Sequence, residues 1–171
     1  MKDAQAVANK VDQAIIKSRL NSLTIMMMTD RSERLRRIAT VLQELPNGAY
    51  LIGTGPSTVG IIPVTVEEVV LGRAATPLEK PADGIVDYEV SDTMYLGPHE
   101  VSRLHAKVRR VREGSGWTVT AFDLGSKCGT FVNGESIDGE DDGRQLAHGD
   151  VIALGASHTS TYLFVEVNDA Q

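Results

Sequence analysis

The sequence predicts a mainly β protein, an antiparallel β-sandwich with a short helical segment at its N-terminus. Helical spacing of apolar residues, at intervals of three and four, is confined to the first 46 residues. From position 49 onward apolar and polar residues alternate, and Gly, Pro, Asn and Asp separate the alternating runs. Many short strands joined by turns are typical of a sandwich of two antiparallel sheets. We therefore divide the chain into a helical extension, residues 1–46, and a β-sandwich domain, residues 47–171.

The extension predicts two helices. The first covers residues 4–20, and the second starts at Asp30, whose side chain can cap the helix together with Glu33 three residues further on. The apolar run between them, residues 23–28, fits either a strand or a buried helix. One apolar stripe marks the second helix: Leu35, Ile38, Leu42 and Leu45. The Pro-Asn-Gly sequence at 46–48 ends this helix and marks the domain boundary.

Two interpretations of this extension are open at the level of sequence. Its helices can bind a partner or a second copy of the chain, or they can cover an edge of the sheet that follows. Neither helix is long enough to be stable alone, so each must pack on something. Four arginines surround the apolar stripe, and we interpret them as a solvated helix face: Arg31, Arg34, Arg36 and Arg37.

The predicted strands follow one another closely after residue 49. They cover residues 50–52, 60–66, 69–72, 85–90, 94–97, 105–111, 117–122, 130–132, 135–137, 151–154 and 162–167. In the strand at 117–122, alternation places Trp117, Val119 and Ala121 on one face. The dipeptide Asn133-Gly134 predicts a type I′ hairpin turn between two of the strands.

Composition argues against several classes of protein. The formal net charge of −6 disfavours general nucleic-acid binding. A single cysteine, Cys128, excludes an internal disulfide framework and fits a reducing compartment. The N-terminus lacks the apolar run of a signal peptide, and no apolar stretch is long enough to cross a membrane. We therefore expect a cytoplasmic protein that contacts neither nucleic acid nor membrane.

Two loops rich in hydrogen-bond donors, residues 98–105 and 125–130, stand on either side of a predicted strand pair. If those strands pair antiparallel, both loops emerge at one end of one sheet. The residues brought together there would be Ser102, Arg103, Ser126, Lys127 and Thr130. Hydroxyls, cations and glycine-exposed amides suit an oxyanion. The set has neither a carboxylate pair nor a metal-ligand cluster, so we expect no metal and no cofactor.

The same region resembles the forkhead-associated (FHA) domain, a family of phosphothreonine-peptide readers. Four pieces occur in the family's order: Gly72-Arg73, then Ser102-x-x-His105, then Gly129-Thr130-x-x-Asn133-Gly134, and finally Leu146-x-x-Gly149-Asp150-x-Ile152-x-Leu154-Gly155. The resemblance covers roughly residues 50–168. It implies an FHA-type β-sandwich that binds phosphothreonine without catalysis.

The resemblance also implies roles for individual residues. Those expected to contact the phosphothreonine are Arg73, Ser102, Arg103, Lys127 and Cys128. Those expected to shape the site are Gly72, His105, Gly129, Thr130 and Asn133. Two features depart from the family: Cys128 stands where an asparagine usually grips the peptide backbone, and residues 74–95 form an insertion between Arg73 and Ser102.

We expect a non-enzymatic module that binds a phosphothreonine-containing partner in a Ser/Thr kinase pathway. One alternative is a scaffold that acts without phosphate, self-associating through its N-terminal helices. Another is self-recognition, with Thr24, Thr29 or Thr40 phosphorylated and captured by a second copy.

Cys128 raises two further alternatives. With His105 as base and Asp123 as orienting group it has the residue types of a catalytic triad, although nothing in the sequence brings the three together. Alternatively, Cys128 is a redox-sensing thiol, since Lys127 and the loop amides would favour the thiolate.

Overall fold

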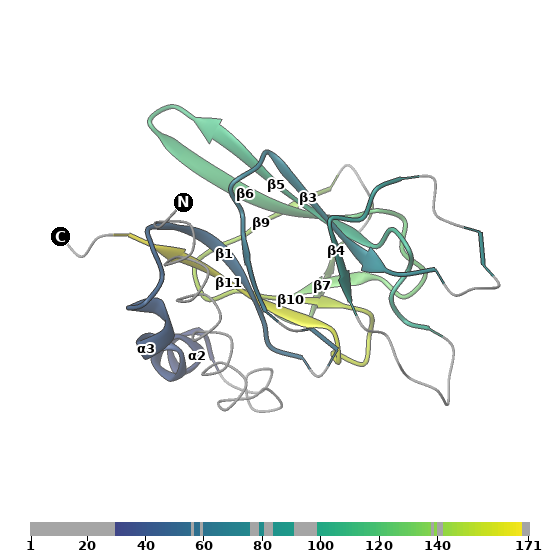
Figure 1. The fold of residues 1–171 in the computed structure, drawn as a ribbon, viewed down its shortest axis with the longest axis horizontal. Helices are drawn as coiled ribbons and strands as arrows, with labels where there is room; N and C mark the ends of the chain where they lie inside the picture. The colour runs from purple at the N-terminus through teal and green to yellow at the C-terminus, as the bar shows by residue number, and fades with distance from the viewer. Residues whose placement is uncertain are drawn as a thin grey trace, which may run out of the picture.

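Two β-sheets packed face to face form the body of the protein, and two short helices cover the outer face of one sheet (Figure 1). The computed structural model describes residues 30–55, 57–58, 60–75, 79–80, 84–90, 99–137, 139 and 142–168. The expected helix at 4–20, the apolar run at 23–28 and the expected strand at 94–97 lie outside these residues. The predicted sandwich architecture is confirmed.

The first sheet has six strands in the order β2-β1-β11-β10-β7-β8. Their bounds are β1 Gly48–Gly53, β2 Ile61–Pro63, β7 Thr130–Val132, β8 Glu135–Ile137, β10 Val151–Leu154 and β11 Thr161–Val167. Every described pairing in this sheet is antiparallel. Asn133 and Gly134 connect β7 to β8 with positive φ angles of 52° and 85°, as the predicted type I′ turn requires.

The second sheet has five strands in the order β4-β3-β5-β6-β9. Their bounds are β3 Glu68–Arg73, β4 Tyr88–Val90, β5 Ala106–Glu113, β6 Gly116–Asp123 and β9 Arg144–Gln145. The β3–β4 pair is parallel, whereas the other described pairs of this sheet are antiparallel. Strand β9 was not predicted, because two exposed polar residues carry no alternation.

The middle strands of the first sheet are buried on both faces. Ala49 and Leu51 of β1 pack into the core between the sheets, while Tyr50 and Ile52 pack into a second core beneath the helices. Strand β11 divides in the same way, with Phe164 in the first core. Two-sided burial explains why these strands read as continuous apolar runs rather than as strict alternation.

The helical segment closes this second core. Asp30 caps α2 (Arg31–Arg37), its carboxylate accepting the Glu33 N–H at 2.9 Å, as predicted. The helix breaks at Ile38, where φ is −101° and ψ is 7°, and α3 (Ala39–Leu42) follows. The apolar face that packs against β1, β10 and β11 consists of Ile38, Val41 and Leu45, with Leu35 and Leu42 partly buried. Among the described residues, the extension therefore covers a face of its own sheet rather than an edge.

Two side chains differ in exposure from the residues that the sequence groups with them. Arg34 is only 7% exposed, so the interpretation of the arginines as a solvated face is wrong for this residue. Trp117 is 50% exposed because the β5–β6 hairpin extends past the sandwich (Figure 1). The Arg110 guanidinium lies over its ring, 4.2 Å from the ring centre.

No helix among the described residues is both long and apolar enough to span a membrane.

Candidate functional site

The two donor-rich loops meet at one end of the sandwich. Strands β5 and β6 pair so that Ala106 lies opposite Asp123, which sets the residues before β5 beside those after β6. The backbone N–H of Lys127 donates to Ser102 Oγ at 3.0 Å. The juxtaposition expected from antiparallel pairing is therefore present. The Lys127 side chain is exposed, and Ser102 and Cys128 are half-buried.

Gly72 allows strand β3 to lie directly against the first loop. A Cβ at this position would come within 2.0 Å of the Arg103 carbonyl oxygen, which leaves no room for any side chain. The next residue, Arg73, donates its backbone N–H to the Ser102 carbonyl at 3.1 Å. The Gly-Arg pair thus brings the start of the Arg73 side chain beside Ser102.

His105 is completely buried and ties the two loops together. Its Nδ1 accepts the Ser102 backbone N–H at 2.9 Å. Since Nδ1 acts as an acceptor, the ring proton lies on Nε2, which donates to the Gly129 carbonyl 3.0 Å away. That carbonyl also accepts the Gly155 N–H at 2.9 Å, which joins the 155–160 loop to the same point.

Asp123 organises the second loop from within. Its Oδ1 accepts the hydroxyls of Ser126 and Thr130, each at 2.6 Å, and its Oδ2 accepts the Ser126 N–H at 2.9 Å. Burial by itself raises the pKa of Asp123, but these hydrogen bonds and the nearby His105 imidazole outweigh it and hold the pKa below the ordinary 3.8. The Ser126 and Thr130 hydroxyls, which the sequence predicted to donate to an anion, therefore donate to Asp123 instead.

These contacts do not form a catalytic triad. The described hydrogen bonds of His105 go to backbone groups, and those of Asp123 go to Ser126 and Thr130. With both ring nitrogens engaged in this way, His105 has no nitrogen directed at the Cys128 thiol as a base would require.

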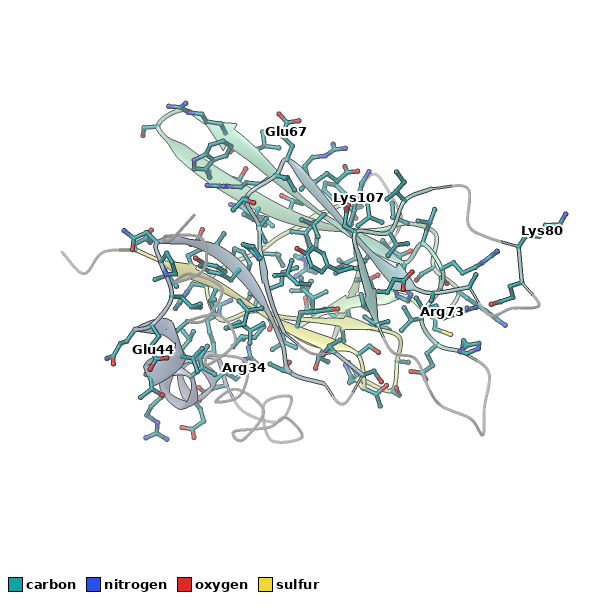
Figure 2. All side chains as sticks on the ribbon, in the orientation of Figure 1. Arg34, Glu44, Glu67, Arg73, Lys80 and Lys107 are labelled. Atoms are coloured by element: carbon teal, nitrogen blue, oxygen red, sulfur yellow. The ribbon has the colours of Figure 1, made fainter. Side chains whose placement is uncertain are left out.

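The cationic side chains of the first loop and of β3 are engaged by residues of the insertion. Arg73 has 10% of its side chain exposed, and its Nη1 and Nη2 each donate to a Glu79 carboxylate oxygen at 2.8 Å. Nη1 also donates to the Ala74 carbonyl at 3.0 Å. Arg103 Nη1 donates to the Lys80 carbonyl. Figure 2 shows Arg73 and Lys80 at the end of the sandwich away from Arg34 and Glu44.

The sequence that forms these loops matches the model of a known protein family. The family model for the FHA domain matches residues 69–155, just over half of the chain. The chain belongs to the FHA domain family. A sequence search of curated proteins found no match.

Solved structures support this assignment at the level of fold. The FHA domain of the CT664 protein from Chlamydia trachomatis is 24% identical, with a TM-score of 0.51, covering 70% of this chain and 98% of its own. Full-length yeast Pml1p is 15% identical with a TM-score of 0.56, covering 81% and 94%. The MEK1 FHA domain, solved with a HOP1 phosphothreonine peptide, is 21% identical with a TM-score of 0.50, covering 72% and 100%.

Asn133 lies on the β7–β8 turn of this FHA domain and does not contact the second loop through its described hydrogen bonds. Its Oδ1 accepts the Val151 N–H at 3.1 Å and Arg34 Nη2 at 3.0 Å, and its Nδ2 donates to Asp150 Oδ1 at 2.9 Å. Arg34 Nε also donates to the Gly149 carbonyl at 3.1 Å. The residue expected to support the second loop instead joins β7, the 147–151 turn and α2.

Sequence reasoning did not identify the third loop of the FHA domain, residues 155–160. Glu100 reaches it from the first loop, its Oε2 accepting the Ser157 N–H at 3.2 Å and the Ser157 hydroxyl. Gly155 was recognised only as the end of a motif, although its φ of 91° and the Glu100 side chain against it make it part of the junction. Glu79 was not assigned to the site, and Asp123 was considered only as the orienting group of the catalytic alternative.

Proposed function

We propose that this FHA domain binds phosphothreonine-containing segments of a partner protein at the end where the loops meet. The observation that carries the proposal is the position of Ser102. Its carbonyl accepts the Arg73 N–H, its hydroxyl accepts the Lys127 N–H, and its own N–H donates to His105. The hydroxyl proton of Ser102 can be donated to a phosphate oxygen, with Arg73 and Lys127 beside it.

The chemistry of the ligand matches this set. A phosphothreonine carries close to two negative charges at neutral pH and three acceptor oxygens. Arg73 would supply a planar fork for a bidentate contact. Ser102 would donate a hydroxyl, and Arg103 and Lys127 would add cationic contacts. Cys128, at the position of the peptide-binding asparagine, would face the peptide backbone next to the phosphothreonine.

The role that follows is recognition rather than reaction. We propose that phosphorylation by a Ser/Thr kinase creates the ligand and that the domain then recruits the modified protein in the cytoplasm. The peptide of the MEK1 FHA domain structure is of this chemical type and supports the proposal. The inward direction of His105 and Asp123 argues against a catalytic role for either residue.

An oriented phosphothreonine peptide library, measured with its unphosphorylated and phosphoserine counterparts, tests this function. We expect micromolar or tighter binding that is selective for phosphothreonine. Arg73→Ala and Ser102→Ala should each weaken it by about tenfold to a hundredfold, because each removes a charge-assisted contact of about 1.5–3 kcal/mol.

Arg112→Ala is the matched control for Arg73→Ala. Arg112 is an exposed arginine on β5, near the tip of the β5–β6 hairpin. Its replacement by alanine therefore removes the same charge at a distance from the loops. Binding that persists unchanged in folded Arg73→Ala protein, or that does not depend on phosphate in any sequence, would contradict the proposed function.

A further inference from the structure

Glu79 pairs with the guanidinium of Arg73, the group that the proposed phosphate site needs. Its two carboxylate oxygens each accept one terminal nitrogen of Arg73 at 2.8 Å. This is the bidentate geometry in which an arginine also holds a phosphate. With 10% of its side chain exposed, Arg73 cannot present the same two nitrogens to a second anion while Glu79 stays in place.

The residue after Glu79 engages a second member of the site. Arg103 Nη1 donates to the Lys80 carbonyl, so two neighbouring residues of the insertion contact two of the predicted phosphate-binding side chains. Arg103 is half-buried in this arrangement. Both contacts come from one short stretch of chain, Glu79 and Lys80.

The chain on both sides of Glu79 and Lys80 is anchored close to the site. Arg73 precedes Glu79 by six residues, at the end of β3. On the other side, Gly84 lies against Leu104, since a Cβ there would come within 2.9 Å of Leu104 Cδ1. Asp87 then exchanges two hydrogen bonds with Val70 of β3, at 2.8 and 3.0 Å. Tethering at both ends keeps the effective concentration of the Glu79 carboxylate at Arg73 high.

We propose that Glu79 is a built-in competitor for phosphothreonine: its carboxylate holds Arg73 in the free protein, and a phosphopeptide binds by displacing it. The inference rests on the proposed function of the same site. A phosphate dianion carries more charge than the carboxylate it replaces, so it can displace Glu79, whereas a peptide carboxylate would exchange like for like. The apparent affinity for the phosphopeptide equals the intrinsic affinity multiplied by the fraction of molecules in which Arg73 is not held by Glu79.

Glu79→Gln tests the competition, because it keeps the size of the side chain and removes its charge. We expect it to bind the best phosphothreonine peptide from the library roughly threefold to tenfold more tightly than the wild-type protein, by isothermal titration calorimetry. Glu67→Gln is the matched control: Glu67 is exposed on the turn before β3, and Figure 2 shows it far from Arg73. The control changes the net charge equally and should leave the affinity unchanged.

The outcomes separate the two proposals. Equal or weaker peptide binding by Glu79→Gln, with clear binding by the wild-type protein, overturns the competitor and makes Glu79 a group that positions Arg73. An equal gain in Glu67→Gln also overturns it, because net charge alone would then account for the effect. If neither the wild-type protein nor Glu79→Gln binds any phosphopeptide, the proposed function fails and the competitor fails with it, since release of Arg73 should have revealed binding.

Discussion

Ser102 shows how much of the site depends on one residue. Its backbone carbonyl, backbone N–H and hydroxyl bond to Arg73, His105 and Lys127, which come from three separate segments. A short polar side chain in a loop usually satisfies itself locally. Because the contacts with Arg73 and Lys127 are long-range, Ser102 is instead held in one orientation, and we infer that its hydroxyl is directed at the ligand before binding.

Cys128 stands at the position where the resemblance to the family leads us to expect a peptide-binding asparagine. It is half-buried and precedes Gly129, whose φ of 78° sets the turn of the second loop. A thiol is a weak hydrogen-bond donor and acceptor, whereas an asparagine amide offers two donors and an acceptor. We therefore expect the present site to hold the peptide backbone weakly.

Cys128→Asn should consequently tighten binding of the phosphothreonine peptide. Adding one or two amide hydrogen bonds at about 1 kcal/mol each corresponds to a gain of about fivefold or more. Fluorescence anisotropy with a labelled peptide measures the change, and Cys128→Ser is the control because a hydroxyl is too short to reproduce the amide. Unchanged binding by the asparagine variant would mean that another residue holds the peptide backbone.

At the level of secondary structure, α2 and α3 belong energetically to the sandwich. They cover the outer face of β1, β10 and β11, and the described part of the extension directs its apolar side chains at its own sheet. Arg34 adds a polar connection, with its Nε and Nη2 bonded to Gly149 and Asn133. These contacts give no support to the scaffold alternative for residues 30–45, because the apolar face that a partner would need is already covered.

Arg34→Ala should therefore destabilise the whole domain. It removes charged hydrogen bonds from the buried Gly149 carbonyl and from the Asn133 side chain, at a cost of about 2–4 kcal/mol. Arg36→Ala on the same helix is the control, since its side chain is 76% exposed and pairs only with Glu33 among its described ion pairs. That variant should cost no more than about 0.5 kcal/mol. Urea unfolding of both full-length variants gives the comparison, and equal midpoints would show that Arg34 is not a structural connection.

For the molecule as a whole, two buried carboxylates link stability to pH. Burial raises the pKa of Asp150, but hydrogen bonds from Asn133, the Ala147 N–H and Arg31 outweigh it and hold the pKa below 3.8. The pKa of Asp123, which lies at the end of β6 away from the hairpin tip, is also lowered. In both cases the folded state binds its proton at lower pH than the unfolded state.

Stability should therefore fall in acid. The contribution of each carboxylate is complete above its unfolded pKa near 3.8 and is lost as the pH falls through the lower folded value. Thermal unfolding between about pH 6 and pH 3 should show a falling midpoint. Asp150→Asn and Asp123→Asn should each flatten this dependence, whereas Glu113→Gln, on the exposed hairpin, should not. A midpoint that stays constant to about pH 3 would contradict the assignment.

Much of the fold was predictable because it depends on local patterns. Alternation located β3, β5 and β6, short apolar runs located β1, β10 and β11, and Asn133-Gly134 located the β7–β8 turn. Residues with special backbone requirements were equally visible: Gly72 is needed because the Arg103 carbonyl lies where its side chain would be. The break at Ile38 was not visible, since α2 and α3 follow the packing of Ile38 and Val41 onto the sheet rather than any breaking residue.

The sequence by itself determined the family, the sandwich and the residues that meet at its loop end, because short motifs and a period of two are properties of neighbouring residues. Only the tertiary structure decided where side chains with long-range partners go. Arg34 donates a hydrogen bond to Asn133, 99 positions further along the chain, and the insertion brings Glu79 back onto Arg73. Charge and hydrogen-bonding capacity can be read from the chain, but the partner of each group depends on which segments the fold places together.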